Sequence, residues 1–191
     1  MKSLSAERLR HVAHLQGPMD VLALDLLDRS AIEETIQSVQ PTEIYNLAAR
    51  ASSSTLQSEP AVTLECNGLA VVRMLEAIQR MNPAIRLCQA SSSEMFGATD
   101  HSPQDEETPF RPRNAYGAAK LYAHWMVANF RNVHGLFACS AILFNHESPR
   151  RGPEYVTRRI SRAVAMIRAG RQEKLELGDL EARRDWGFAG D

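Results

Sequence analysis

Residues 85–97 read Ile-Arg-Leu-Cys-Gln-Ala-Ser-Ser-Ser-Glu-Met-Phe-Gly, a short apolar strand that runs directly into a polar turn. Three hydroxyls, at residues 91–93, and the carboxylate of Glu94 follow the strand. In open parallel sheets, ligands bind at the carboxyl ends of the strands. The stretch therefore predicts a strand that delivers polar side chains to a binding edge, although serines in this position can also simply cap a strand.

Alternating strand and helix patterns flank this stretch on both sides. We expect strands at residues 21–26, 43–49, 85–91 and 136–144, with a short final strand at 174–177. We expect helices after a cap at Asp28, from 60 to 81, from 115 to 134 and from 158 to 169, and a polar loop at 98–113. Repeated βα units imply a parallel sheet that is covered by helices.

The composition narrows the class of protein. The chain has 191 residues, a hydrophobic fraction of 44% and a net charge of −1, which suits one soluble domain and offers no basic field for nucleic acid. No apolar run approaches the ~20 residues of a membrane span. The three cysteines, Cys66, Cys88 and Cys139, form no CxxC pair and indicate a reducing compartment. We expect a cytoplasmic protein with no nucleic-acid partner and no membrane partner.

Residues 116–120 read Tyr-Gly-Ala-Ala-Lys at the start of the long predicted helix. A spacing of four places the Tyr116 phenol and the Lys120 ammonium on one helix face, about one turn apart. A nearby cation can stabilise the phenolate that tyrosine needs in order to act as a base. Taken alone, the pair can also be an ordinary helix start with a partly buried tyrosine. The serine and glutamate turn before it favours the catalytic interpretation.

In combination, residues 91–97 followed by Tyr116 and Lys120 resemble the extended short-chain dehydrogenase/reductase family and, within it, the GDP-mannose 4,6-dehydratase branch. The resemblance covers about residues 20–191. The remaining motifs occur in family order: Asp25-Leu26, YNLAA at 45–49, LFNHESPRRG at 143–152, VTR at 156–158 and RRDWG at 183–187. The NHESPRRG run is the most specific of them, because Tyr-x-x-x-Lys is shared by the whole superfamily.

The resemblance implies an α/β fold, a Rossmann-like doubly wound parallel sheet. It also implies that the first βα unit, with its glycine-rich loop, and most of the C-terminal substrate domain are lacking. Among the ten glycines, only Gly187 and Gly190 lie within three residues of each other, so no glycine cluster for a pyrophosphate is present. We expect residues 1–191 to form one partial NAD(P)-binding domain, with the nucleotide-sugar region beginning at about residue 145.

The family reaction is an internal redox dehydration of GDP-mannose that uses NADP and gives GDP-4-dehydro-6-deoxymannose. By resemblance, Tyr116 with Lys120 takes the proton of the sugar 4-hydroxyl, and Glu94 takes the proton of C5. Ser92 or protonated Glu94 then helps the 6-hydroxyl to leave as water. No metal is required, and the only close histidine pair, His11 and His14, lies in a segment without a pattern.

The resemblance also assigns binding residues by position. The expected cofactor residues are Asp25, Leu26, Leu47, Ala48, Ala49, Arg50, Ala51, Val62, Tyr116, Lys120, His146 and Arg151. The expected substrate residues are Ser92, Asn145, Val156, Arg159 and Arg184. Alternatives remain: residues 47–49 can be an ordinary buried strand end, and the arginines between 150 and 162 can be a solvated basic helix face.

Two hypotheses of different class follow. The first is an NADP-dependent dehydratase acting on GDP-mannose, assembled as a dimer or tetramer of identical chains. The second is a non-catalytic remnant, or one piece of a split enzyme, that binds a nucleotide sugar or a family subunit. The full set of expected catalytic residues favours the first, whereas the missing glycine loop favours the second.

Overall fold

The computed structural model describes residues 19–51 and 58–190. The chain divides into two compact units, Met1–Leu143 and Phe144–Asp191. His11 and His14 lie outside the described residues. No helix in the described ranges has the length and apolar character needed to cross a membrane.

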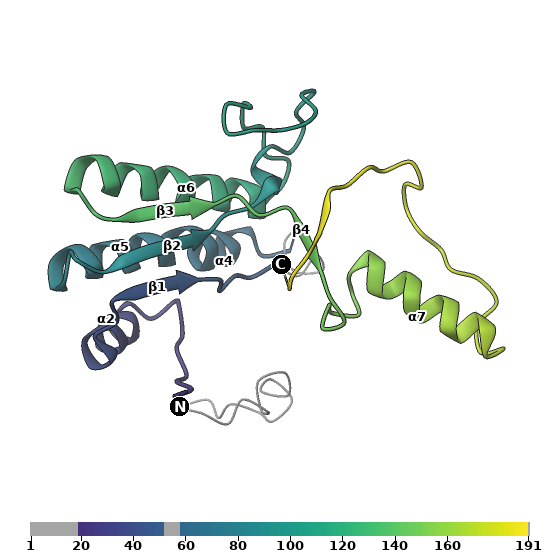
Figure 1. The fold of residues 1–191 in the computed structure, drawn as a ribbon, viewed down its shortest axis with the longest axis horizontal. Coiled ribbons are helices and arrows are strands. Elements are labelled where there is room, and N and C mark those ends of the chain that lie inside the picture. The colour runs from purple at the N-terminus through teal and green to yellow at the C-terminus, as the bar shows by residue number, and fades with distance from the viewer. Residues whose placement is uncertain (1–18, 52–57, 191) are drawn as a thin grey trace. The chain divides into compact units, whose positions relative to one another are not determined.

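The first unit is built on a parallel three-stranded sheet (Figure 1). The strands β1 (Glu43–Asn46), β2 (Arg86–Ala90) and β3 (Ala138–Ala141) lie in that spatial order. Its helices are α2 (Arg29–Val39), α4 (Pro60–Leu64), α5 (Ala70–Met81) and α6 (Ala115–His134), with a π-helical turn at Glu65–Leu69 and a 3-10 turn at Ser93–Met95. The predicted parallel α/β arrangement is confirmed.

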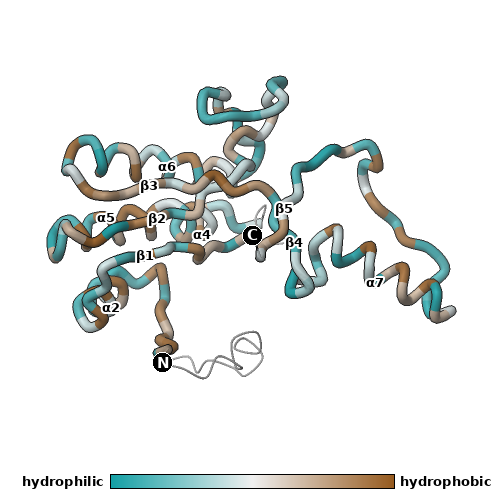
Figure 2. Tube along the Cα trace, viewed as in Figure 1, coloured by the Kyte–Doolittle hydropathy of each residue, from teal (hydrophilic) through white to brown (hydrophobic). Residues whose placement is uncertain are grey.

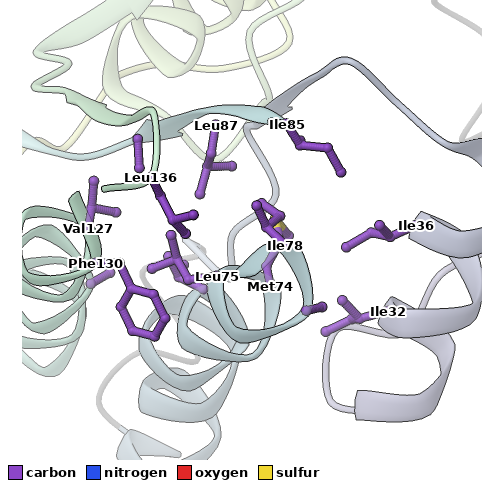
Figure 3. Packing of buried hydrophobic residues seen from close by; sticks show 14 residues of the cluster. Ile32, Ile36, Met74, Leu75, Ile78, Ile85, Leu87, Val127, Phe130 and Leu136 are labelled. Carbon is purple, nitrogen blue, oxygen red and sulfur yellow. The ribbon is translucent and has the colours of Figure 1, made fainter. Parts of the chain in front are cut away.

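One face of this sheet carries the core (Figure 3). Helices α2, α5 and α6 supply apolar side chains at helical spacing, such as Ile32 and Ile36 of α2 and Val127 and Phe130 of α6, which pack with Leu87 of β2. Hydrophobic and hydrophilic residues alternate along α5 and α6, as an amphipathic covering helix requires (Figure 2). The core thereby holds α6 against the helix-covered face of the sheet.

The opposite face of the sheet is open in the described residues. Tyr45, Cys88 and Cys139 are paired in register across the three strands and share that face, because side chains alternate along a strand. Tyr45 is 68% exposed, Cys139 is exposed and Cys88 is half-buried. The helices that the structure describes therefore cover one side of β1, β2 and β3.

The second unit is smaller. Its strands β4 (Asn145–Glu147) and β5 (Trp186–Phe188) pair in parallel, and α7 (Val156–Arg168) lies between them in the chain. The basic amphipathic helix predicted at 158–169 is confirmed, with its start two residues earlier.

Three strand predictions need correction. Residues 21–26 form no strand, since no strand of the described residues pairs with them and β1 pairs only with β2; a strand needs a neighbouring ladder for its backbone groups. Residues 174–177 are irregular, and the last strand forms at β5 instead. The strand expected at 136–144 is shorter than predicted: β3 covers Ala138–Ala141, and β4 begins at Asn145, after the predicted end.

Candidate active site

The turn after β2 is tied to the sheet beyond the last strand residue. The amide of Ser91 donates to the carbonyl of Ala141 (2.8 Å), and the amide of Ser93 donates to the carbonyl of Leu143 (2.9 Å). Ser92 is extended and buried, and its Oγ accepts from the amide of Glu94 at 3.2 Å. These bonds hold the short 3-10 turn at the carboxyl edge of the sheet, where the sequence predicted a binding edge.

Helix α6 begins against this turn. Asn114 is its N-cap residue, with Oδ1 accepting from the Gly117 amide at 2.8 Å, while Nδ2 donates to Oε2 of Glu94 at 2.9 Å. A Cβ at residue 117 would lie 2.5 Å from the carbonyl oxygen of Glu94, so the two backbones approach closely. The exposed Glu94 carboxylate is therefore held beside the helix turn that carries Tyr116.

Lys120 is the most unusual side chain of this region. It is 2% exposed, and its Nζ donates to the carbonyl of Ala90 at 2.8 Å. Nζ lies 5.6 Å from the centroid of the Tyr116 ring, as the four-residue spacing predicted. Burial lowers the pKa of Lys120 to about 8, because removal from water disfavours the ammonium form. The amine nevertheless remains mainly protonated at pH 7.

A buried polar chain leads to Lys120 from β1. Asn46 donates through Nδ2 to Oε1 of Gln89 at 2.7 Å, and Gln89 donates through Nε2 to the carbonyl of Ala90 at 2.7 Å. That carbonyl therefore accepts from Gln89 and Lys120 together. Sequence reasoning missed Asn46 and Gln89 as site residues; a polar side chain within each of two apolar strands was the available signal.

The loop after β1, assigned to the cofactor, is clamped by a residue that the sequence did not reveal. Asn67, in the π-helical turn, accepts from the Arg50 amide at 2.9 Å and donates to the Arg50 carbonyl at 3.0 Å. The Arg50 side chain pairs with Glu59. Asp25 and Arg50 both act electrostatically on the Cys66 thiol, whose pKa is raised mainly by burial. These contacts gather Asp25, Arg50 and Cys66 in one region.

The other predicted cofactor residues of this unit lie around the same loop or before α2. Leu47, Ala48 and Ala49 are exposed rather than buried, which corrects the alternative of an ordinary buried strand end. Ala51 is partly buried, and Val62 is half-buried in α4. Leu26 belongs to the irregular segment and the turn that precede α2.

The remaining predicted residues lie in the second unit. Asn145 in β4 donates to the carbonyl of Asp185 at 3.2 Å, and Nδ1 of His146 lies 3.0 Å from the carbonyl oxygen of Phe144. Val156 begins α7 and is exposed. Arg159 donates to the carbonyl of Glu176 at 3.3 Å, and Arg184 donates to the neighbouring carbonyl of Arg183 at 2.6 Å.

This unit contains a cavity of about 520 Å³. Arg151 lines it, with its guanidinium 3.7 Å from the Tyr155 ring centroid and its Nε 3.3 Å from Oε1 of Glu147. The cavity is also lined by Trp186 and Phe188 of β5 and by Arg158 of α7. Arg159 does not line it. Two aromatic rings and two cations suit a ligand with a planar ring and an anionic group.

Comparisons with known proteins match this chain to one family. A profile of the family described as GDP-mannose 4,6 dehydratase matches residues 1–191. The GDP-mannose 4,6 dehydratase of Cricetulus griseus is 45% identical over 196 residues, covering 99% of this chain and 53% of that protein. GDP-mannose 4,6 dehydratase 1 of Arabidopsis thaliana is 48% identical over 171 residues, covering 87% of this chain and 47% of that protein. The chain thus spans about half the length of these relatives.

Solved structures share the fold. The structure of RMD from Pseudomonas aeruginosa complexed with NADPH aligns with a TM-score of 0.77 and 25% identity, covering 93% of this chain and 61% of that chain. A dTDP-glucose 4,6-dehydratase from Bacillus anthracis in complex with NAD aligns with a TM-score of 0.70 at 20% identity, over 87% of this chain and 49% of that chain. The Rossmann-like fold predicted from the sequence is confirmed by these likenesses.

Proposed function

We propose that this chain, which belongs to the GDP-mannose 4,6-dehydratase family, carries the acid and base groups that remove water from GDP-mannose with the help of NADP. The observation that supports the proposal most is the convergence at one sheet edge of the Tyr116–Lys120 pair with Ser92 and Glu94. Each of these side chains belongs to the first unit.

The described residues fit the nicotinamide half of NADP. Lys120 brings an ammonium to the carboxyl edge of a parallel sheet, where such cofactors bind, and the Asn67 clamp gives the loop at Arg50 a fixed backbone. The chemistry that NADP would supply there is reversible hydride transfer with the sugar. Lys120 and the loop at residues 47–51 would hold it.

Tyr116 and Lys120 act on the 4-hydroxyl. The Lys120 ammonium stabilises negative charge on the Tyr116 phenol oxygen, so that this oxygen can take the hydroxyl proton. Among residues 19–51 and 58–190, the Lys120 ammonium donates to the Ala90 carbonyl, which also accepts from Gln89. The ammonium is thereby fixed in position, and its other N–H groups can donate to ligand oxygens.

Glu94 and Ser92 act on the neighbouring carbons. The Asn114 amide occupies Oε2 of Glu94, which leaves Oε1 to take the C5 proton once C4 is a ketone. The Ser92 oxygen accepts from the Glu94 amide, so its own hydrogen is free to point toward the leaving 6-hydroxyl. Loss of that hydroxyl with a proton gives water.

The second unit would bind the nucleotide end of the substrate. Its cavity offers Trp186 and Phe188 for stacking on a base and Arg158 for a phosphate. The proposal keeps the substrate residues expected from the sequence, which are Asn145, Val156, Arg159 and Arg184. It also keeps His146 and Arg151 as cofactor residues. Assembly into a dimer or tetramer belongs to the same proposal; the exposed Trp125 on α6 offers an apolar contact for it.

A second function, nucleotide-sugar binding without turnover, is favoured by one observation. The cavity proposed for the nucleotide is lined by residues of the second unit, whereas the acid and base groups proposed above belong to the first, so nucleotide binding does not depend on those groups. Calorimetric titration with NADP and with GDP-mannose, alongside mass analysis for a product lighter by one water, separates the two functions. Dehydrated product from the purified chain supports the first function. Binding of GDP-mannose without product supports the second, and absence of both binding and product refutes the proposal.

A further inference from the structure

We propose that Asn114 is a positioning residue that orients the Glu94 carboxylate while it caps helix α6, and this inference rests on the function proposed above. One side-chain amide makes both contacts. Its Oδ1 accepts from the Gly117 amide at 2.8 Å, and its Nδ2 donates to Oε2 of Glu94 at 2.9 Å.

The first contact determines the direction of the second. The Gly117 amide can only donate, so the oxygen of Asn114 must face it. The amide nitrogen then points to the other side, where Glu94 lies. A carboxylate can only accept when ionised, which makes it the matching partner for that nitrogen.

Capping alone does not require an amide. Helix α2 is capped by Asp28, whose Oδ1 accepts from the Ala31 amide at 3.1 Å, and aspartate, serine and asparagine cap helices about equally well. Of these three residue types, aspartate cannot donate at neutral pH and serine must accept and donate through one oxygen, whereas asparagine accepts at the helix through Oδ1 and donates to a second group through a separate atom, Nδ2. The choice of residue at 114 is therefore explained by Glu94 rather than by α6.

The backbone packing around Asn114 makes the arrangement rigid. The α6 N-terminus lies so close to the turn that a Cβ at 117 would meet the Glu94 carbonyl oxygen at 2.5 Å. The Glu94 main chain is thus placed by Gly117 and its side chain by Asn114. Tyr116 lies between Asn114 and Gly117 in the chain. The proposed base for the 4-hydroxyl, Tyr116, and the proposed base for C5, Glu94, are therefore held at the same helical turn.

Substitutions can separate capping from positioning. Asn114→Asp keeps an oxygen for the Gly117 amide and has no donor for Glu94. Asn114→Ser keeps the capping oxygen on a shorter side chain, so one atom replaces the separate Oδ1 and Nδ2, and Asn114→Ala loses both contacts. We expect the unfolding midpoint to fall only for Asn114→Ala. We expect Asn114→Ser to reduce kcat about tenfold, the effect of one lost hydrogen bond, with KM for GDP-mannose unchanged and less solvent deuterium incorporated at C5. Asn114→Asp should lose more, because it places a second negative charge beside Glu94.

A direct readout of the hydrogen bond does not depend on turnover. In the nuclear magnetic resonance spectrum of the full chain, Glu94→Ala should shift the side-chain amide signals of Asn114, and the control Glu106→Ala, an exposed carboxylate in the loop at 98–113, should leave them in place. Unshifted signals in Glu94→Ala overturn the proposal, as does wild-type kcat in Asn114→Asp. If the wild-type chain forms no dehydrated product, the proposed function fails, and the amide signals alone decide the contact between Asn114 and Glu94.

Discussion

The buried ammonium of Lys120 should make stability rise with pH in the alkaline range. Its pKa falls from 10.5 to about 8 because of burial. Between these values the unfolded chain holds the proton and the folded chain does not, so unfolding becomes less favourable as pH increases. A difference of about 2.5 in pKa, at about 1.4 kcal/mol for each pKa unit, gives about 3 kcal/mol by pH 10.5. Below pH 8 the lysine is charged in both states and contributes no pH dependence.

Lys120→Met isolates this contribution from those of the tyrosines and cysteines that titrate in the same range. The Ala90 carbonyl keeps its bond from Gln89, so methionine leaves no buried acceptor without a partner. Urea unfolding between pH 7 and pH 10.5 measures the free energy of unfolding of both proteins. We expect the variant to be the more stable at pH 7 and its advantage to shrink by about 3 kcal/mol toward pH 10.5. An advantage that stays constant over this range would refute the argument.

Three further substitutions probe the framework of the site. Gly97→Ala should destabilise the chain by more than about 1 kcal/mol in urea unfolding, because φ is +53° and the added Cβ would lie 2.1 Å from the Arg111 carbonyl oxygen; Gly170→Ala, at φ +68° with open space around it, is the matched control for backbone strain alone. Asn67→Ala should cost about 1–3 kcal/mol and speed hydrogen exchange of the Arg50 amide, and unchanged exchange would argue against the clamp. Tyr116→Phe should abolish product formation while calorimetry still detects GDP-mannose binding, and normal turnover would contradict the role given to its phenol oxygen.

Local patterns predicted the parts of the site that depend on local geometry. The four-residue spacing of Tyr116 and Lys120 was enough to place them on one helix face, and the helix forms over the residues expected. The polar turn at residues 91–94 also lies at the strand end, as the alternation of strands and helices indicated. In both cases the information lies within a few residues of chain.

Contacts between distant segments were missed because they depend on register. Asn46 and Gln89 are 43 residues apart, and they meet only because β1 and β2 pair in parallel with these positions opposite each other. Asn114 and Glu94 are 20 residues apart and separated by an irregular loop. The strand expected at 21–26 failed for the same reason, since apolar character does not supply a neighbouring strand.

The two units divide the chemistry in a way that can be tested. Glu94 is hydrogen-bonded to Asn114 and Ser92, and Lys120 donates to the Ala90 carbonyl. All of these residues lie within Met1–Leu143. The cavity that suits a nucleotide lies entirely within Phe144–Asp191. The proposed function therefore predicts that substitutions of cavity residues such as Trp186 act on substrate affinity. The side chains of Glu94 and Lys120 should keep their positions, because none of their described partners lines that cavity.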